Sequence, residues 1–333
     1  MNKNIFLTYF LSFGIFTSLY GQLIVKGKVL NQNNNIPISY ANIGILNSKF
    51  GTISNRDGSF SISIEDSLVN KKLIFSAIGY EKKSLPLKTM TYNKNIIIYL
   101  NEKEIALNEV VLSAPIKRIK EKHAWLGNHK KNLFVQGTMQ VDSATAGGAT
   151  ALLIEKEDDF DLQFISKARL FISKNTEPEF KVRVRFLEVD KSNNNLPGDD
   201  LINESIVVTT DIKRGWLTFD LSSFNFEVNK TSFFLVFEWI LEDKDRIRLF
   251  NNFNKYVESN PNKIKRDSVL IDGKKVPSAS ISSSAPIPLI IFGDSRTQSA
   301  LKKHKCYIRK SSFAKWKRAR GILSAKVLMT NRP

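Results

Sequence analysis

The chain has 333 residues, which is enough for one large or two ordinary domains, and its 42% hydrophobic and 11% aromatic content excludes an intrinsically disordered protein. The formal net charge is +18, but the charge is unevenly distributed. Residues 295–333 contain twelve Lys or Arg and no Asp or Glu, so the basic residues of 1–294 exceed the acidic ones by only six. We therefore expect two domains, neither of them strongly basic as a whole, and no nucleic-acid partner.

Residues 1–21 have the layout of a signal peptide. Lys3 precedes an almost uncharged run at 5–20 that is rich in Phe and Leu, and small and polar residues follow it. The run is too short to favour a membrane span, and no later stretch approaches the roughly 18 apolar residues of a membrane helix. We expect export to the periplasm or outer membrane, with peripheral membrane association at most. Cys306, the single cysteine, cannot form an internal disulfide and is expected to be buried or reactive.

The segment 22–100 has the pattern of a domain built from short strands. Phe60, Ile62 and Ile64 alternate with serines, which predicts a half-buried strand. Asp57 and Gly58, just before it, predict a chain reversal and a hairpin with the preceding residues 51–53. Further strands are expected at 23–29, 36–45, 72–78, 81–87 and 95–100. About six short strands separated by turns predict an antiparallel β-sandwich.

Four blocks of this segment carry a family resemblance. They are Val25-Lys26-Gly27-Lys28-Val29, residues 37–43 (Pro-Ile-Ser-Tyr-Ala-Asn-Ile), residues 51–60 (Gly-Thr-Ile-Ser-Asn-Arg-Asp-Gly-Ser-Phe) and residues 75–81 (Phe-Ser-Ala-Ile-Gly-Tyr-Glu). In this order they resemble the carboxypeptidase-regulatory-like domain, a transthyretin-like sandwich that is common in exported envelope proteins of Bacteroidetes-type bacteria. The resemblance implies a non-catalytic module.

Residues 101–145 are expected to be a basic linker. Their first part resembles the segment that follows this domain in TonB-dependent outer-membrane receptors, where a Glu-Val-Val stretch can add itself as a strand to an energy-coupling partner. Glu109, Val110 and Val111 are thus a candidate partner strand, although a final strand leading into a linker is the favoured interpretation. His123 and His129 have no metal-ligand partner at a useful spacing, so a solvated connector is expected here.

Residues 146–333 are expected to form a second, jelly-roll-like β-sandwich. Residues 180–186 alternate four apolar side chains with three cations, which predicts a strand with an exposed basic row. Residues 233–240 are apolar on both faces and predict a central strand, whereas only 243–258 have helical spacing. Other strands are expected at 151–154, 206–210, 215–221, 288–292, 307–308 and 325–329, and a hairpin is expected over 269–276 around Asp272-Gly273.

The sequence contains no cluster that indicates catalysis. It has three histidines, one cysteine and no His-Glu-x-x-His zinc motif, so we expect a non-enzyme without metal or cofactor. The acidic cluster 155–161 is consistent with a Ca²⁺ site, but a solvated loop is favoured. Glu188 and Asp220 are the carboxylates that a hydrolase hypothesis would pair, without a specific spacing to select them.

The leading hypothesis is an exported, non-catalytic envelope protein that binds or scaffolds an envelope protein or glycan. One alternative is a glycan-binding jelly-roll protein with Trp216, Trp239 or Trp316 as stacking platforms, because the strands around the first two resemble those of carbohydrate-binding jelly rolls. Core packing is the favoured fate of Trp216 and Trp239. The remaining alternatives are an accessory of a TonB-dependent uptake system and a carboxylate-based hydrolase.

Overall fold

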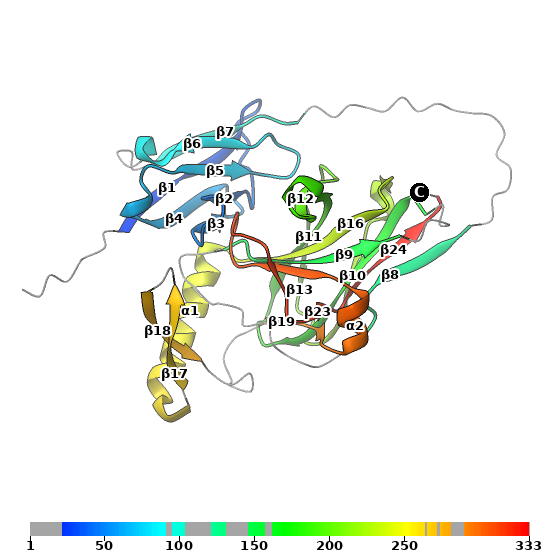
Figure 1. Ribbon diagram of the computed structural model, residues 1–333. Helices are drawn as coiled ribbons and strands as arrows, with labels where there is room; N and C mark the ends of the chain where they lie inside the picture. Colours follow the sequence, from blue (N-terminus) through cyan, green and yellow to red (C-terminus); the bar gives the residue numbers. More distant parts are fainter. Residues whose placement is uncertain are drawn as a thin grey trace, which may run out of the picture.

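The protein is almost entirely β-structure. The computed structural model describes residues 22–90, 95–103, 121–130, 146–156, 162–263, 265–271, 274–280 and 290–332. Over these ranges the chain forms two β-sandwiches and two helices, α1 (Asp243–Ser259) and α2 (Gln298–Lys303) (Figure 1). Neither helix has the length and apolar character needed to cross a membrane. The all-β sandwich prediction is confirmed.

The first sandwich consists of two sheets. In one, β1 (Gln22–Asn31) runs antiparallel to β4 (Ser59–Glu65) and parallel to β7 (Ile96–Leu100). The other has the order β3 (Gly51–Ile53), β2 (Asn42–Gly44), β5 (Lys72–Ser76) and β6 (Lys83–Pro86). The parallel β1–β7 pair differs from the antiparallel arrangement expected from the sequence.

The predicted strand at residues 59–64 is β4, with Phe60, Ile62 and Ile64 buried and Phe60 packed edge-on against Phe75 of the opposite sheet, 5.6 Å between ring centroids. The turn before it has the expected chemistry, since Gly58 has φ 75° and the Asp57 carboxylate accepts a hydrogen bond from the Ser59 amide. The predicted hairpin is wrong, however. β3 pairs with β2 and β4 pairs with β1 along its whole length, so this turn carries the chain from one sheet to the other.

The second sandwich packs a six-stranded sheet against a seven-stranded sheet. The six-stranded sheet has the order β14 (Gly215–Asp220), β10 (Phe164–Asn175), β24 (Ala325–Thr330) and β8 (His123–Gly127), with β15 (Phe226–Glu227) and β19 (Ile290–Phe292) also paired to β10. The seven-stranded sheet has the order β12 (Leu196–Asp200), β11 (Phe180–Asp190), β16 (Ser232–Ile240), β9 (Ala149–Glu155), β21 (Cys306–Arg309) and β22 (Lys317–Arg318), with β13 (Ile206–Thr210) paired to β11. The predicted linker therefore contains β8, a strand of this second sandwich.

The core of this sandwich confirms several expectations. β16 lies between β11 and β9 and is buried at every position after Ser232, as its two apolar faces predict. The predicted helix is α1, but its buried side chains are Arg246 and Leu249, whereas Ile247 of the expected apolar spacing is 52% exposed. β17 (Lys265–Ile271) pairs with β18 (Lys274–Ser280) as the predicted hairpin. A short pair, β20 (Asp294–Ser295) with β23 (Ile322–Leu323), completes the strands. Cys306 is buried, and burial raises the pKa of its thiol to about 12, so the thiolate that reacts is not formed near neutral pH.

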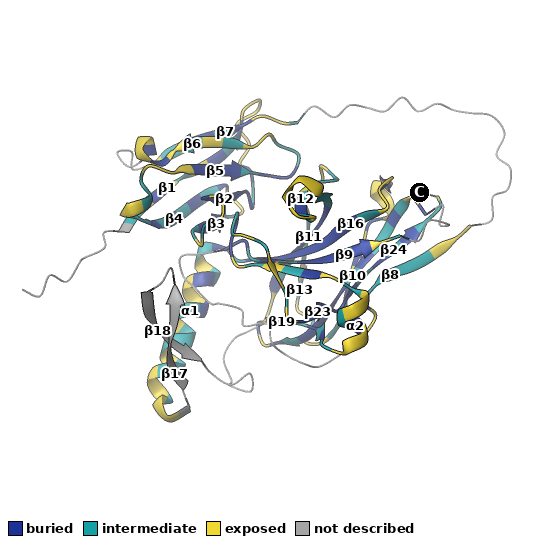
Figure 2. Ribbon diagram, viewed as in Figure 1, coloured by how far each residue is buried: buried dark blue, intermediate teal, exposed yellow. Residues whose placement is uncertain are grey.

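The two sandwiches contact each other through backbone and buried side chains. The Ala146 amide donates to the Gly51 carbonyl at 2.9 Å, and the Ser312 hydroxyl donates to the Asn42 side-chain oxygen at 2.7 Å. Gly51 must be glycine for this approach, because a Cβ there would lie 2.1 Å from the carbonyl oxygen of Ser312. Asn42 and Ser312 are both buried, and Figure 2 shows buried residues in both sandwiches. The contact therefore excludes water from groups of both halves.

Candidate functional site

A buried ion cluster lies on the outer face of the seven-stranded sheet. Glu238 on β16 is 0% exposed and faces Arg183 on β11, whose Nε donates to Glu238 Oε2 at 2.7 Å. Arg185 Nη1 donates to Glu238 Oε1 at 2.6 Å, and Arg309 on β21 forms a third ion pair with the same carboxylate. Arg185 also makes a bidentate pair with Asp200, with both distances 2.8 Å. Three arginines and two carboxylates thus form one network.

The first sandwich covers this ion cluster. Arg183 Nη1 donates to the backbone carbonyl of Tyr40 at 2.8 Å, so a residue of the first sandwich accepts one of its hydrogen bonds. Arg183 is 1% and Arg185 9% exposed. The predicted exposed basic row is therefore wrong at these two positions, because an arginine can be buried where carboxylates and carbonyls satisfy its fixed set of donors.

The ion cluster holds its charges in their ionised forms. Burial alone would raise the pKa of Glu238, but Arg183, Arg185 and Arg309 hold it well below its usual range. Burial lowers the pKa of Arg309 to about 10; attraction to Glu238 opposes this decrease, and repulsion by the other two arginines adds to it. The network is buried, and Arg183 links it to the Tyr40 carbonyl of the first sandwich, so it forms part of the contact between the two sandwiches.

A second group of cations lies on the opposite side of the second sandwich, on the outer face of the six-stranded sheet. The Lys326 ammonium lies 4.6 Å from the ring centroid of Trp125 and 4.8 Å from that of Trp216. The Arg169 guanidinium lies 4.8 Å from the Trp125 ring. All four side chains are partly exposed, and Trp216 packs edge-on against Phe171 at 5.3 Å. We call Trp125, Trp216, Arg169 and Lys326 the aromatic–basic face.

Sequence reasoning identified one member of the aromatic–basic face, Trp216, and missed the other three. Trp125 was missed because it lies in the predicted linker. A signal was present, since Ala124 and Leu126 flank it and both pack against the core of the second sandwich. That alternation is typical of a strand and places Trp125 on the outer side.

The other two candidate tryptophans lie elsewhere. Trp239 is 7% exposed and belongs to the core of the second sandwich. Trp316 packs beside β9 and β16 on the outer face of the seven-stranded sheet, with the Arg309 guanidinium 5.0 Å from its ring. The structure thus does not bring the three predicted tryptophans into one groove. Trp216 and Trp316 are both partly exposed, and Trp216 is the one that shares a cation with a second indole ring.

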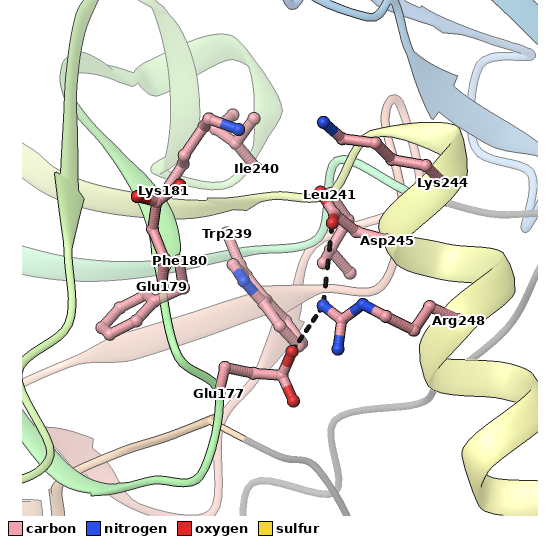
Figure 3. A pocket seen from close by; sticks show the side chains of 10 residues that line it. All are labelled: Glu177, Glu179, Phe180, Lys181, Trp239, Ile240, Leu241, Lys244, Asp245 and Arg248. Carbon is pink, nitrogen blue, oxygen red and sulfur yellow. Dashed lines mark ion pairs between the residues drawn. The ribbon is translucent and has the colours of Figure 1, made fainter.

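A small pocket opens between α1 and the ends of β11 and β16 (Figure 3). Its volume is about 70 Å³, and Trp239 and Phe180 form apolar parts of its wall. The Arg248 guanidinium spans it, 2.5 Å from Glu177 Oε2 and 3.7 Å from Asp245 Oδ1. Ligand pockets usually enclose about 300–1,000 Å³. This pocket therefore has room for a few waters beside an ion pair and is too small for a sugar or a cofactor.

The structure does not support a functional site at the remaining candidate residues, which are the partner strand, the acidic cluster and the carboxylate pair. Glu109, Val110 and Val111 lie outside the described residues, as do residues 157–161 of the acidic cluster. Glu188 on β11 and Asp220 on β14 belong to different sheets, and Asp220 bonds the amide and hydroxyl of Ser222. Within the described ranges, no group of three or more His, Cys, Asp or Glu could hold a metal ion.

Comparison with known proteins bears on the first sandwich. No curated protein matches the chain. The family model of the CarboxypepD_reg-like domain matches residues 25–112, a range that includes every strand of the first sandwich except the beginning of β1. The resemblance inferred from the four sequence blocks is thereby confirmed for this part of the chain, and its first sandwich is a CarboxypepD_reg-like domain.

Proposed function

We propose that this protein is an exported, non-catalytic component of the cell envelope in which a CarboxypepD_reg-like domain and a second β-sandwich act together as one binding or scaffolding unit. The observation that carries the proposal is the buried joint between the two sandwiches. Glu238, three arginines and the Tyr40 carbonyl form a network with members from both halves. A scaffold needs such a joint because a fixed geometry reduces the entropy lost when a partner binds.

Polar and apolar contacts around the ion cluster extend the joint. The Tyr40 hydroxyl of the first sandwich donates to Glu242 at 3.5 Å, and the amide of Asp243 donates to the side-chain oxygen of Asn55, in the first sandwich, at 2.9 Å. Ile53 of the first sandwich and Ile240 of the second belong to one buried apolar cluster. Together these contacts favour two halves that move as one body.

The export part of the proposal is supported by residues 1–21. A cationic start, an apolar run and a small, polar end are the three parts that a signal peptidase substrate requires. The test is to express the full chain with a carboxy-terminal tag in a Gram-negative host, fractionate the cells and determine the amino terminus of the product. We expect cleavage close to residue 21 and recovery from the periplasmic or outer-membrane fraction.

The matched control replaces two apolar residues of the run with cations, Leu11→Arg and Phe13→Arg, which should abolish cleavage without altering either sandwich. An uncleaved product in the cytoplasm for the unaltered chain would contradict export. The scaffold part is tested by limited proteolysis of the purified mature protein. Separation into two stable halves under native conditions would contradict a single unit, whereas protection of residues 146–156 at the joint supports it.

A further inference from the structure

We propose that the aromatic–basic face binds an acidic polysaccharide, an inference that rests on the proposed function because it takes the ligand to be a component of the envelope or its surroundings. The four residues come from four neighbouring strands, with Trp216 on β14, Arg169 on β10, Lys326 on β24 and Trp125 on β8. Adjacent strands are about 4.8 Å apart, so the face presents rings and cations side by side on a hydrogen-bonded sheet.

The charge of this face favours an anionic ligand. The outward positions of the four strands include Lys167, Arg169 and Lys326, while Asp220 is their single carboxylate. Asp220 lies at the edge, directly opposite Lys167 in the β10–β14 ladder. Glu227 of β15, which also pairs with β10, adds a second outward carboxylate to this sheet. Three cations against two carboxylates still leave an excess of positive charge that a polymer of uronic acids would complement.

Neighbouring residues extend the positive field beyond the strands. Lys130, three residues after β8, donates to the hydroxyls of Thr297 and Ser299 at the start of α2, and Lys303 lies at the end of that helix. His129 lies next to them, with Nε2 3.3 Å from the Trp125 carbonyl oxygen. Burial lowers the pKa of His129, and the charges of Lys326 and Lys303 lower it further, which is the effect expected of a cluster of cations.

The indole rings favour a sugar polymer over a simple anion. Apolar ring area complements the C–H surfaces of sugar rings, and a cation held beside a ring can pair with a carboxylate on the same sugar. Lys326, whose ammonium lies near two indoles, presents both kinds of contact at one place. Nucleic acid also stacks on aromatic side chains and pairs with cations, so an oligonucleotide is the necessary competitor in the test.

The test measures binding of the full mature chain to polygalacturonate by isothermal titration calorimetry, with neutral dextran and a single-stranded oligonucleotide as comparisons. We expect binding to polygalacturonate, none to dextran, and a weaker affinity at higher salt because exposed charges are screened. The double variant Arg169→Glu/Lys167→Glu should weaken binding at least tenfold. The double variant Lys26→Glu/Lys28→Glu is the matched control, since it changes the charge equally on the exposed face of β1.

Trp125→Ala provides a second, charge-neutral variant and should also weaken binding about tenfold or more, while a thermal melt verifies that each variant folds. Equal loss of binding in the Lys26→Glu/Lys28→Glu control would overturn the proposal, because it would show a response to net charge alone. Tighter binding of the oligonucleotide than of polygalacturonate would also overturn it. If polygalacturonate does not bind but the protein is exported and proteolytically compact, the inference fails and the proposed function stands.

Discussion

The second sandwich carries cations on both of its outer faces, and the two faces differ in how those cations are neutralised. On the seven-stranded sheet, Arg183 and Arg185 meet Glu238 and Asp200 and are covered by the first sandwich. On the six-stranded sheet, Arg169 and Lys326 meet indole rings and stay partly exposed. The same residue type in the same alternating pattern therefore serves a joint on one side and a surface on the other.

The difference follows from what each partner contributes. A carboxylate neutralises a guanidinium and accepts its hydrogen bonds, which allows burial of both groups. An indole ring attracts a cation without neutralising it or accepting its donors, so the cation keeps its charge and its contact with water. Arg169 and Lys326 thus lie beside indole rings on a partly exposed face, whereas Arg183 and Arg185 form buried ion pairs with carboxylates of the chain.

The largest expected effect comes from removing the charge of the ion cluster. Glu238→Gln keeps the size of the side chain but leaves Arg183, Arg185 and Arg309 with Asp200 as their remaining carboxylate. Breaking a buried ion pair in this way costs about 3–5 kcal/mol of unfolding free energy. Urea unfolding followed by tryptophan fluorescence measures it. Glu227→Gln, at an exposed position on β15, is the control and should change the stability by less than about 0.5 kcal/mol. Equal stabilities of the two variants would show that the cluster does not hold the joint.

The same carboxylate predicts a dependence of stability on pH. The folded protein holds the pKa of Glu238 below its value in the unfolded chain, which is about 4.3. Its contribution is therefore fully present above about pH 4.3 and is lost as the pH falls toward the folded pKa, since the unfolded state then binds more protons. Between pH 6 and pH 3 the unaltered protein should lose more stability than Glu238→Gln, and the gap between them should narrow. Parallel curves of unfolding free energy against pH would contradict this assignment.

A somewhat smaller effect is expected where the two sandwiches approach most closely. In Gly51→Ala the added methyl group would meet the Ser312 carbonyl across the joint, and backbone must shift to admit it. Overpacking of this kind costs about 1–3 kcal/mol. The control is Thr218→Ala, at an exposed position on β14 in the other sheet of the second sandwich. Urea unfolding and the rate of limited proteolysis at the joint should both respond in the first variant only. An unchanged rate of proteolysis at the joint in Gly51→Ala would show that the close approach of Gly51 and Ser312 does not hold the two sandwiches together.

Local patterns in the sequence predicted where strands and helices lie better than they predicted which strands pair with each other. Alternation located β4 and β11, the apolar run located β16, and helical spacing located α1. The parallel β1–β7 pair and the sheet change between β3 and β4 could not be read in this way, because side-chain alternation fixes which face is buried and does not name the neighbouring strand. The turn residues Asp57 and Gly58 are equally suited to a hairpin and to a crossing between sheets.

The ion cluster and the aromatic–basic face were missed because each depends on residues far apart in the chain. Arg183 and Glu238 are 55 positions apart, and Tyr40 is 143 positions from Arg183. One signal was nevertheless present. Glu238 is a lone carboxylate in the apolar run 233–240, which was expected to be covered on both faces, and a buried carboxylate needs cationic partners. The predicted strand at 180–186, with its three outward cations, was the nearest one in the sequence that could supply these cationic partners.

The smallest expected effect is on the aromatic–basic face. Lys326→Met keeps the apolar stem of the side chain and removes the ammonium that lies near the rings of Trp125 and Trp216. A cation–π contact at an exposed site contributes about 0.5–1 kcal/mol, so the unfolding free energy should fall by about that amount, to be measured by urea unfolding at low salt. Lys26→Met, at an exposed position on β1, is the control and should leave the stability unchanged. A loss of several kcal/mol in Lys326→Met would mean that this face, like the ion cluster, depends on its cation for folding, and would remove the contrast between the two outer faces of the second sandwich.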